Sequence, residues 1–311
     1  MTIRAIIDIL TQWAPLCYAE DFDNVGLLTG SANQPCKGVL ITLDTLEPVV
    51  DEAIASGCNL IVSFHPILFK GLKKITGDDY VQRTILKAIK HDIAIFAIHT
   101  ALDNHQNGVN AAIAERLQLQ STKILVPKKG TIKKLVTYVP KENEKKVLEA
   151  LYEAGSGALG NYDQCSFVTE GFGSFRGNEK SNPSLGQQME KTIVEEKQIQ
   201  VIFSAHQEKQ ILNSLRSAHP YETVAYEIIS TDNENPDIGM GKVGTLKKPM
   251  SGQEFLSFVK KQMQTPMIRH SRLNSKPIQK VAVLGGSGSF VISEAKRSNA
   301  DALVTADLKY H

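Results

Sequence analysis

Two polar side chains stand where predicted strands end, and their types suit a divalent metal ion. The apolar run at residues 59–64 leads directly into His65, and the run at 93–100 leads into Asp103. Because the carboxyl ends of parallel strands meet at one edge of an open sheet, we expect both side chains at the same edge. Imidazole and carboxylate together suit Zn²⁺, Fe²⁺, Mn²⁺ or Co²⁺. The pattern therefore predicts a metal site formed by His65 and Asp103.

Two more histidines, His99 and His105, flank Asp103 in the sequence. Either one can act as a further metal ligand or can orient a ligand by a hydrogen bond. The competing interpretation is structural, because a histidine at the end of a strand often only hydrogen-bonds a neighbouring loop. Spacing of this kind produces many false matches, so the sequence leaves both interpretations open.

Two other motifs have a chemical and a structural interpretation. The run Gly285, Gly286, Ser287 and Gly288 follows a predicted strand, so its amides can bind an anion. It lacks the spaced glycines of a dinucleotide site, which favours a tight strand-to-helix turn. The segment 219–222 (HPYE) combines an imidazole, a phenol and a carboxylate, yet its proline favours a rigid turn.

The elements that position these residues alternate between strand and helix over the first 127 residues. Apolar residues repeat with a helical period in some segments and form short β-branched runs in others. The predicted strands are 38–44, 59–64 and 93–100, and the predicted helices are 3–13, 48–56 and 80–90. Alternation of this kind is typical of a parallel, doubly wound sheet.

The pattern changes after residue 125, where 127–130 has the composition of a linker. The next segments are predicted as strand 133–140, helix 142–154, strands 164–171 and 200–205, helix 207–218 and strand 224–230. Their β-α-β, β-α-β order favours a split ferredoxin-like unit. A polar linker at 231–237 ends this block. An α/β pattern then resumes, with a capping box at Ser251 and Glu254 and a predicted strand at 301–306.

Composition excludes several classes of protein. The 311 residues include 35 basic and 33 acidic side chains, a formal charge of +2, so nucleic-acid binding is disfavoured. The four cysteines are scattered, which favours a reducing compartment over a disulfide framework. No apolar run reaches membrane-spanning length, and the amphipathic start is not a signal peptide. We therefore expect a cytoplasmic protein.

Several motifs along the chain resemble the NIF3 family, also called the GTP cyclohydrolase I type 2 or DUF34 family. The motifs are IVSFHPILFKGLKKIT, AIHTALDNHQNGVN, HPYETVAYEI, GMGKVGTL, DALVTADLKYH, DFDNVGLLTG and GSGALGNYDQCSF. The resemblance implies a two-lobed α/β fold with a di-metal centre, assembled as a toroidal hexamer. It also implies an inserted ferredoxin-like α+β domain similar to PII and CutA, so the expected domains are 1–127, 128–237 and 238–311.

The resemblance also assigns residues. The family's His-His-Pro motif falls on Phe64, His65 and Pro66, so its first metal-binding histidine is replaced by Phe64 here, while the aspartate ligand is Asp103. The C-terminal histidine and glutamate ligands have no counterpart, and we expect the chain to be a truncated form with an incomplete last lobe. The implied function is a metal-dependent hydrolase acting on a nucleotide or phosphoester, with up to two divalent ions in a full-length chain. The alternative is a non-catalytic regulatory or scaffold oligomer with a ligand-sensing insert.

Overall fold

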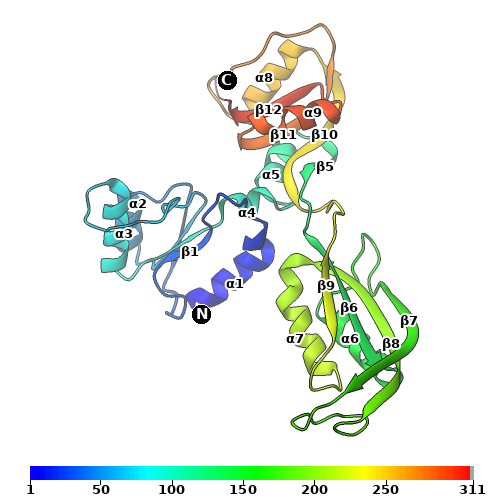
Figure 1. The fold of residues 1–311 in the computed structure, drawn as a ribbon. Helices are drawn as coiled ribbons and strands as arrows, with labels where there is room; N and C mark the ends of the chain where they lie inside the picture. The colour runs from blue at the N-terminus through cyan, green and yellow to red at the C-terminus, as the bar shows by residue number, and fades with distance from the viewer. Residues whose placement is uncertain (309–311) are drawn as a thin grey trace. The chain divides into compact units, whose positions relative to one another are not determined.

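The chain folds into two compact units, and the computed structural model describes residues 1–308 (Figure 1). The first unit comprises Met1–Lys128 and the chain from Pro236 onward, and the second unit is Lys129–Asn235. The end of the DALVTADLKYH motif, residues 309–311, lies outside the described residues, and so does the expectation about the end of the chain. Among residues 1–308, no helix is long and apolar enough to cross a bilayer.

The N-terminal part of the first unit is a four-stranded sheet in the order β1-β4-β3-β2. Its strands are β1 (Gly26–Thr29), β2 (Val39–Thr42), β3 (Leu60–Ser63) and β4 (Ala94–Ala97). The predicted parallel pairing is confirmed for β2, β3 and β4. Strand β1 was not predicted, and it pairs antiparallel with β4, so the sheet is mixed.

Helices cover both faces of this sheet (Figure 1). Helix α1 (Ile3–Trp13) packs on the face that carries Leu60 and Val62. Helices α2 (Glu47–Ala55) and α3 (Tyr80–Lys90) pack on the face that carries Ile61. Alternate residues of a strand point to opposite faces of the sheet. Because helices cover both faces, all four side chains of β3 are buried.

The predicted strand 93–100 is too long. Strand β4 ends at Ala97, and the short helix α4 (His99–Asp103) follows. His99 has a positive φ of 23°, which turns the chain out of the sheet. The backbone amide of Thr100 then donates to Asp23, which satisfies one free amide of the first helical turn. Asp103 therefore lies one helical turn beyond the edge of the sheet.

A second sheet in the first unit has the order β12-β11-β10-β5. Its strands are β5 (Gln120–Pro127), β10 (Gly239–Met250), β11 (Ile278–Ser287) and β12 (Ala302–Asp307). Helices α5 (Val109–Arg116) and α8 (Gly252–Gln262) share one core cluster with it, and α9 (Ile292–Arg297) belongs to another. Strands β5 and β10 were not predicted from the sequence, because their long antiparallel pairing joins segments more than a hundred residues apart.

The second unit has the element order β-α-β-β-α-β, as the sequence predicts. Its elements are β6 (Ile132–Pro140), α6 (Glu144–Glu153), β7 (Ser166–Arg176), β8 (Lys191–Ser204), α7 (Glu208–Ala218) and β9 (Tyr226–Ser230). The sheet has the order β7-β8-β6-β9, and every neighbouring pair is antiparallel. Strands β7 and β8 extend well beyond their predicted ends, because they pair with each other as far as Arg176 and Lys191.

The two helices of the second unit cover one face of its sheet (Figure 1). Leu135 and Ile199 of the sheet pack with Leu151 of α6 and Ile211 of α7 in one buried cluster. Because side chains alternate along a strand, Glu196 and its even-numbered neighbours point to the opposite face. The unit therefore has its own apolar core on the face that the helices cover, and Glu196 lies on the other face.

Candidate metal centre

His65 is the second residue after β3, and backbone hydrogen bonds hold it in place. Its amide donates to the carbonyl of Leu43 (2.9 Å), and the hydroxyl of Ser63 donates to its carbonyl (2.7 Å). Its Nδ1 lies 2.8 Å from Oδ1 of Asp44, the second residue after β2. Because a carboxylate only accepts, Nδ1 is the nitrogen that bears hydrogen in this contact, so the neutral form of the ring has its lone pair on Nε2. The side chain is 44% exposed, so a ligand can reach Nε2.

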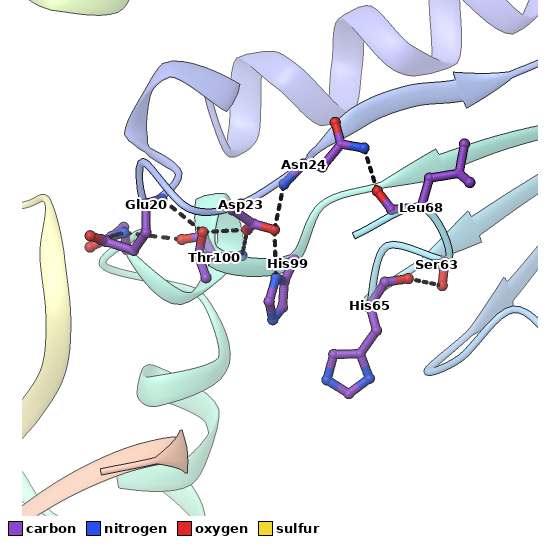
Figure 2. A network of polar contacts seen from close by, with 9 residues as sticks. Glu20, Asp23, Asn24, Ser63, His65, Leu68, His99 and Thr100 are labelled. Carbon is purple, nitrogen blue, oxygen red and sulfur yellow. Dashed lines mark hydrogen bonds and ion pairs between the residues drawn. The ribbon is translucent and has the colours of Figure 1, made fainter. Parts of the chain in front are cut away.

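Asp23 binds the start of α4 through several hydrogen bonds (Figure 2). Its carboxylate accepts from Nδ1 of His99 (2.9 Å) and from the amide (3.1 Å) and hydroxyl (2.5 Å) of Thr100. Burial raises the pKa of this carboxyl, but the hydrogen bonds from His99 and Thr100 outweigh it and lower the pKa below its ordinary value. Asp23 is therefore ionised, and it fixes the tautomer of His99 as Asp44 fixes that of His65.

Asp103 is the last residue of α4 and is buried. Burial raises its pKa from an ordinary 3.8 to about 7, and the negative charges of Asp23 and Glu20 add to the effect while His65 opposes it. His65 and Asp103 are thus close enough to interact electrostatically. Their sharing of one ion stays a prediction.

The ring of Phe64, where the family resemblance implies a metal-binding histidine, contacts both neighbouring imidazoles. Its centroid lies 5.0 Å from that of His65 and 5.4 Å from that of His99, both edge-on. The two imidazoles are themselves 5.3 Å apart. The structure therefore brings His99, Phe64 and His65 together, with an apolar ring where a third donor would stand.

His105 has different contacts. Its ring lies edge-on to Trp13 (5.9 Å), and its Nδ1 accepts from the amide of Asn107 (3.2 Å). Burial, assisted by the charge of Lys242, lowers its pKa, so the ring is neutral at pH 7. These contacts favour the structural interpretation of His105 and leave His99 as the histidine that accompanies His65.

The imidazole of His65 and the carboxylate of Asp103 are the donor types that bind divalent cations, but they are few. A buried carboxylate beside other acidic groups is unfavourable unless positive charge is supplied, and the raised pKa of Asp103 reflects that cost. Within residues 1–308, however, no group of three or more His, Cys, Asp or Glu side chains is arranged to hold a metal. His65 and Asp103 would therefore be the only two protein ligands from this part of the chain, and water would fill the other positions.

The sequence analysis did not identify Asp23 or Asp44 as site residues. A signal for Asp44 exists, because it is the last residue of the predicted strand 38–44, whose carboxyl end lies beside that of the adjacent parallel strand before His65. Asp23 lies in the DFDNVGLLTG motif, whose position beside α4 depends on the antiparallel pairing of β1 with β4. Only the tertiary structure shows that these two carboxylates orient the two histidines.

The other two motifs are built into their own surroundings. Gly285, Gly286 and Ser287 belong to β11, so the predicted tight turn is wrong for these three residues. The amide of Gly285 donates to the side chain of Asn110 (2.9 Å), and the carbonyl of Gly286 accepts from Thr305 (2.8 Å). In the HPYE segment, Nε2 of His219 bonds the carbonyl of Tyr138 (2.8 Å). The segment therefore closes the end of α7, and its tyrosine lines a separate cavity in the second unit.

The chain is similar to known proteins in both sequence and fold. The sequence profile of the Duf34/NIF3 (NGG1p interacting factor 3) family matches residues 1–311. A Bacillus subtilis (strain 168) protein named GTP cyclohydrolase 1 type 2 homolog is 42% identical over 309 residues, which are 99% of this chain and 83% of that protein. A Halalkalibacterium halodurans protein of the same name is 39% identical over 309 residues, with the same shares of each chain. The crystal structure of a Bacillus cereus protein related to NIF3 has a TM-score of 0.84 and 39% identity, and the match covers 100% of this chain and 84% of that one.

Proposed function

The chain belongs to the Duf34/NIF3 family, and on that premise we propose that it is a metal-dependent hydrolase of a nucleotide or phosphoester. The proposed ligands are His65 and Asp103, and the ion is Zn²⁺, Fe²⁺, Mn²⁺ or Co²⁺. One observation carries the proposal: a half-exposed imidazole, oriented by a carboxylate, interacts with a buried carboxyl whose pKa is raised to about 7. The name of two relatives, GTP cyclohydrolase 1 type 2 homolog, supports a nucleotide as the substrate.

Each side chain has a separate task in this proposal. Asp44 holds Nδ1–H of His65, so Nε2 is presented to the ion, and Asp103 supplies negative charge. An ion held by these two residues would supply the Lewis acidity that activates water for attack near neutral pH. His99, held by Asp23 beside His65, hydrogen-bonds the substrate or the attacking water through Nε2.

The second candidate is a non-catalytic regulatory or scaffold oligomer. It is favoured by the small number of metal donors in residues 1–308 and by a cavity within the second unit. We propose that unit 129–235 is an inserted ferredoxin-like domain of the PII and CutA kind. Its own buried core and its antiparallel β-α-β-β-α-β order support this. We also propose a toroidal hexamer, on the basis of the family resemblance.

Calorimetric titration of the metal-free protein with Zn²⁺ and Mn²⁺ tests the metal site. We expect one weakly bound ion, and we expect His65→Ala and Asp103→Asn each to abolish most of the binding. His105→Ala is the matched control, because that ring contacts Trp13 and the loop at Asn107. Tight binding that survives both ligand substitutions would place the ligands elsewhere and overturn the assignment.

Turnover separates the two candidate functions. The hydrolase should release product from GTP or from a phosphoester in the presence of Mn²⁺ or Zn²⁺, and chelation should stop it. His65→Ala should lose turnover, while His105→Ala should retain it. Metal binding without turnover on a broad panel of nucleotides and phosphoesters would favour the regulatory oligomer, and light scattering would then measure its assembly.

A further inference from the structure

The second unit contains a cavity of about 670 Å³, which has no part in the proposed metal centre. Strands β7 and β8 and the turn after α7 form its walls, on the sheet face opposite the two helices. Its volume falls within the roughly 300–1,000 Å³ of pockets that bind small molecules. The residues that line it all belong to the second unit, so the cavity is complete within that unit.

A buried carboxylate, that of Glu196 on β8, faces this cavity. Glu196 is only 9% exposed, and its Oε1 accepts a hydrogen bond from the hydroxyl of Tyr221 (2.8 Å). Burial, together with the hydrogen bond to Glu196, raises the pKa of Tyr221, so the hydroxyl remains a neutral donor. Oε2 lies over Gly173 of β7, where a Cβ atom would collide with it. The backbone of β7 thus leaves room for this carboxylate.

The charges around the cavity are unbalanced in favour of acids. Its charged lining residues are Glu170, Arg176, Glu196 and Glu222. Glu170 already pairs with Lys197, and Nε of Arg176 donates to the carbonyl of Met189 (2.8 Å). The carboxylate of Glu222 accepts from the backbone amide of Asn182 (2.9 Å).

The buried carboxylate itself has only one neutral donor among the described residues, the phenol of Tyr221. The nearby imidazole of His219 has its pKa lowered by burial, so it adds no positive charge at pH 7. A buried carboxylate is costly unless a cation or further hydrogen-bond donors accompany it. Glu196 therefore has the capacity to accept from a charged donor that enters the cavity.

Aromatic side chains form much of the remaining wall. Phe175 packs against Tyr221 with ring centroids 6.1 Å apart, and Tyr138 lines the floor. Aromatic faces attract organic cations through their ring quadrupoles, and they also bury an apolar body. The aromatic wall and the carboxylate of Glu196 thus both favour an organic cation with an apolar body.

We propose that this cavity binds a small organic cation, a protonated amine on an apolar or aromatic body. The ammonium group donates to Oε2 of Glu196, and the apolar body packs against Phe175 and Tyr221. Arg176 also lines the cavity, and its positive charge opposes that of an ammonium group, but its Nε donates to the carbonyl of Met189 and so is not free to pair with Glu196. The cavity shares no residue with the proposed metal centre, so this proposal does not depend on the hydrolase proposal.

Calorimetric titration of the full chain with phenethylamine tests the proposal. Phenethyl alcohol and phenylacetate are the neutral and anionic control ligands of similar size. We expect the amine to bind at least about tenfold more tightly than either control ligand, because a hydrogen bond to a charged group is the stronger kind. Glu196→Gln retains the volume and the acceptor for Tyr221 but lacks the charge, and it should weaken amine binding by a similar factor. Arg176→Gln is the control and should leave amine binding intact or stronger.

Amide chemical shifts of the unmodified protein give a second measurement that needs no variant. Phenethylamine should perturb the backbone amides of residues 171–177, which border the cavity. The proposal is overturned by the absence of saturable amine binding, by equal binding of phenylacetate, by unchanged binding to Glu196→Gln, or by shifts confined to other segments.

Discussion

The Nδ1–H of His99 donates to Oδ1 of Asp23 across 2.9 Å and joins two segments that are 76 positions apart. The same carboxylate accepts from Thr100, so Asp23 holds the first turn of α4 in place (Figure 2). His99 has a positive φ of 23°. This backbone conformation is strained for a residue other than glycine, and it persists only where the surrounding structure holds it. The hydrogen bonds to Asp23 hold this conformation, and they position His99 beside His65.

Asp23→Asn should destabilise the protein by about 1–3 kcal/mol at pH 7, because it removes a charged acceptor from a buried network. The pKa of Asp23 is lowered by folding, so its contribution is present above the unfolded pKa and is lost as pH falls through the folded pKa. Chemical denaturation at several pH values measures this. The difference from wild type should shrink in acid. Asp21→Asn, at an exposed neighbouring position, is the control, and an equal loss there would contradict the prediction.

Asp103→Asn should stabilise the metal-free protein at alkaline pH. The folded pKa of about 7 exceeds the ordinary 3.8, so the folded state binds the proton more tightly and stability falls as pH rises between these values. A shift of this size corresponds to at most ~4 kcal/mol. Thermal melts at about pH 8 and pH 4 in chelator measure it, since the gain should disappear in acid. Asp8→Asn on the exposed face of α1 should show no such gain, and a destabilised Asp103→Asn at high pH would refute the argument.

Metal affinity should fall as the solution becomes acidic. A divalent ion binds the ionised carboxylate, and Asp103 is half protonated at about pH 7 in the metal-free protein. Below that pH, the apparent affinity should decrease about tenfold per unit from this group alone. Mn²⁺ titrations across this range measure the slope. An affinity independent of pH would show that Asp103 is not a ligand.

Phe64→His should strengthen metal binding. The ring of Phe64 lies beside both His65 and His99, and the family resemblance places a metal-binding histidine at this position. A third protein ligand brings the site closer to the three-ligand sets of catalytic zinc centres. We expect at least a tenfold gain, roughly 1.4 kcal/mol, by calorimetry with Zn²⁺. Phe64→Leu removes the aromatic ring without adding a donor, and an equal gain in that variant would show that only steric blocking was relieved.

Residues 129–235, expressed alone, should unfold in one cooperative thermal transition. The segment forms its own compact unit, and the buried residues of its core cluster come from both of its helices and from strands β6 and β8. A unit with a continuous apolar core is expected to fold independently. Circular dichroism measures the transition, and Leu151→Ala should lower the midpoint because it opens a cavity in that core. A broad, non-cooperative melt of the isolated segment would contradict the prediction.

Local sequence determined most elements whose residues bury one face. Helix α3 begins and ends where its apolar period predicts, with Asp79 capping its start. The β-branched run of β3 predicts a strand that is buried on both faces, and it places His65 at the end of that strand. These features depend on neighbours within a few residues, so the sequence carries them directly. Both metal-ligand candidates were identified in this way, and their sharing of one ion stays a prediction.

Only the tertiary structure decided which partners those residues acquire. The sequence shows neither that Asp44 orients His65 nor that Asp23 turns the chain at His99 and ends β4 early. It also hides β5 and β10, whose pairing joins distant segments, and the carboxylate of Glu196 beside Tyr221. The physical reason is common to all of these. Periodicity reports whether a side chain is buried, whereas a hydrogen-bond partner depends on where chain segments far apart in the sequence meet.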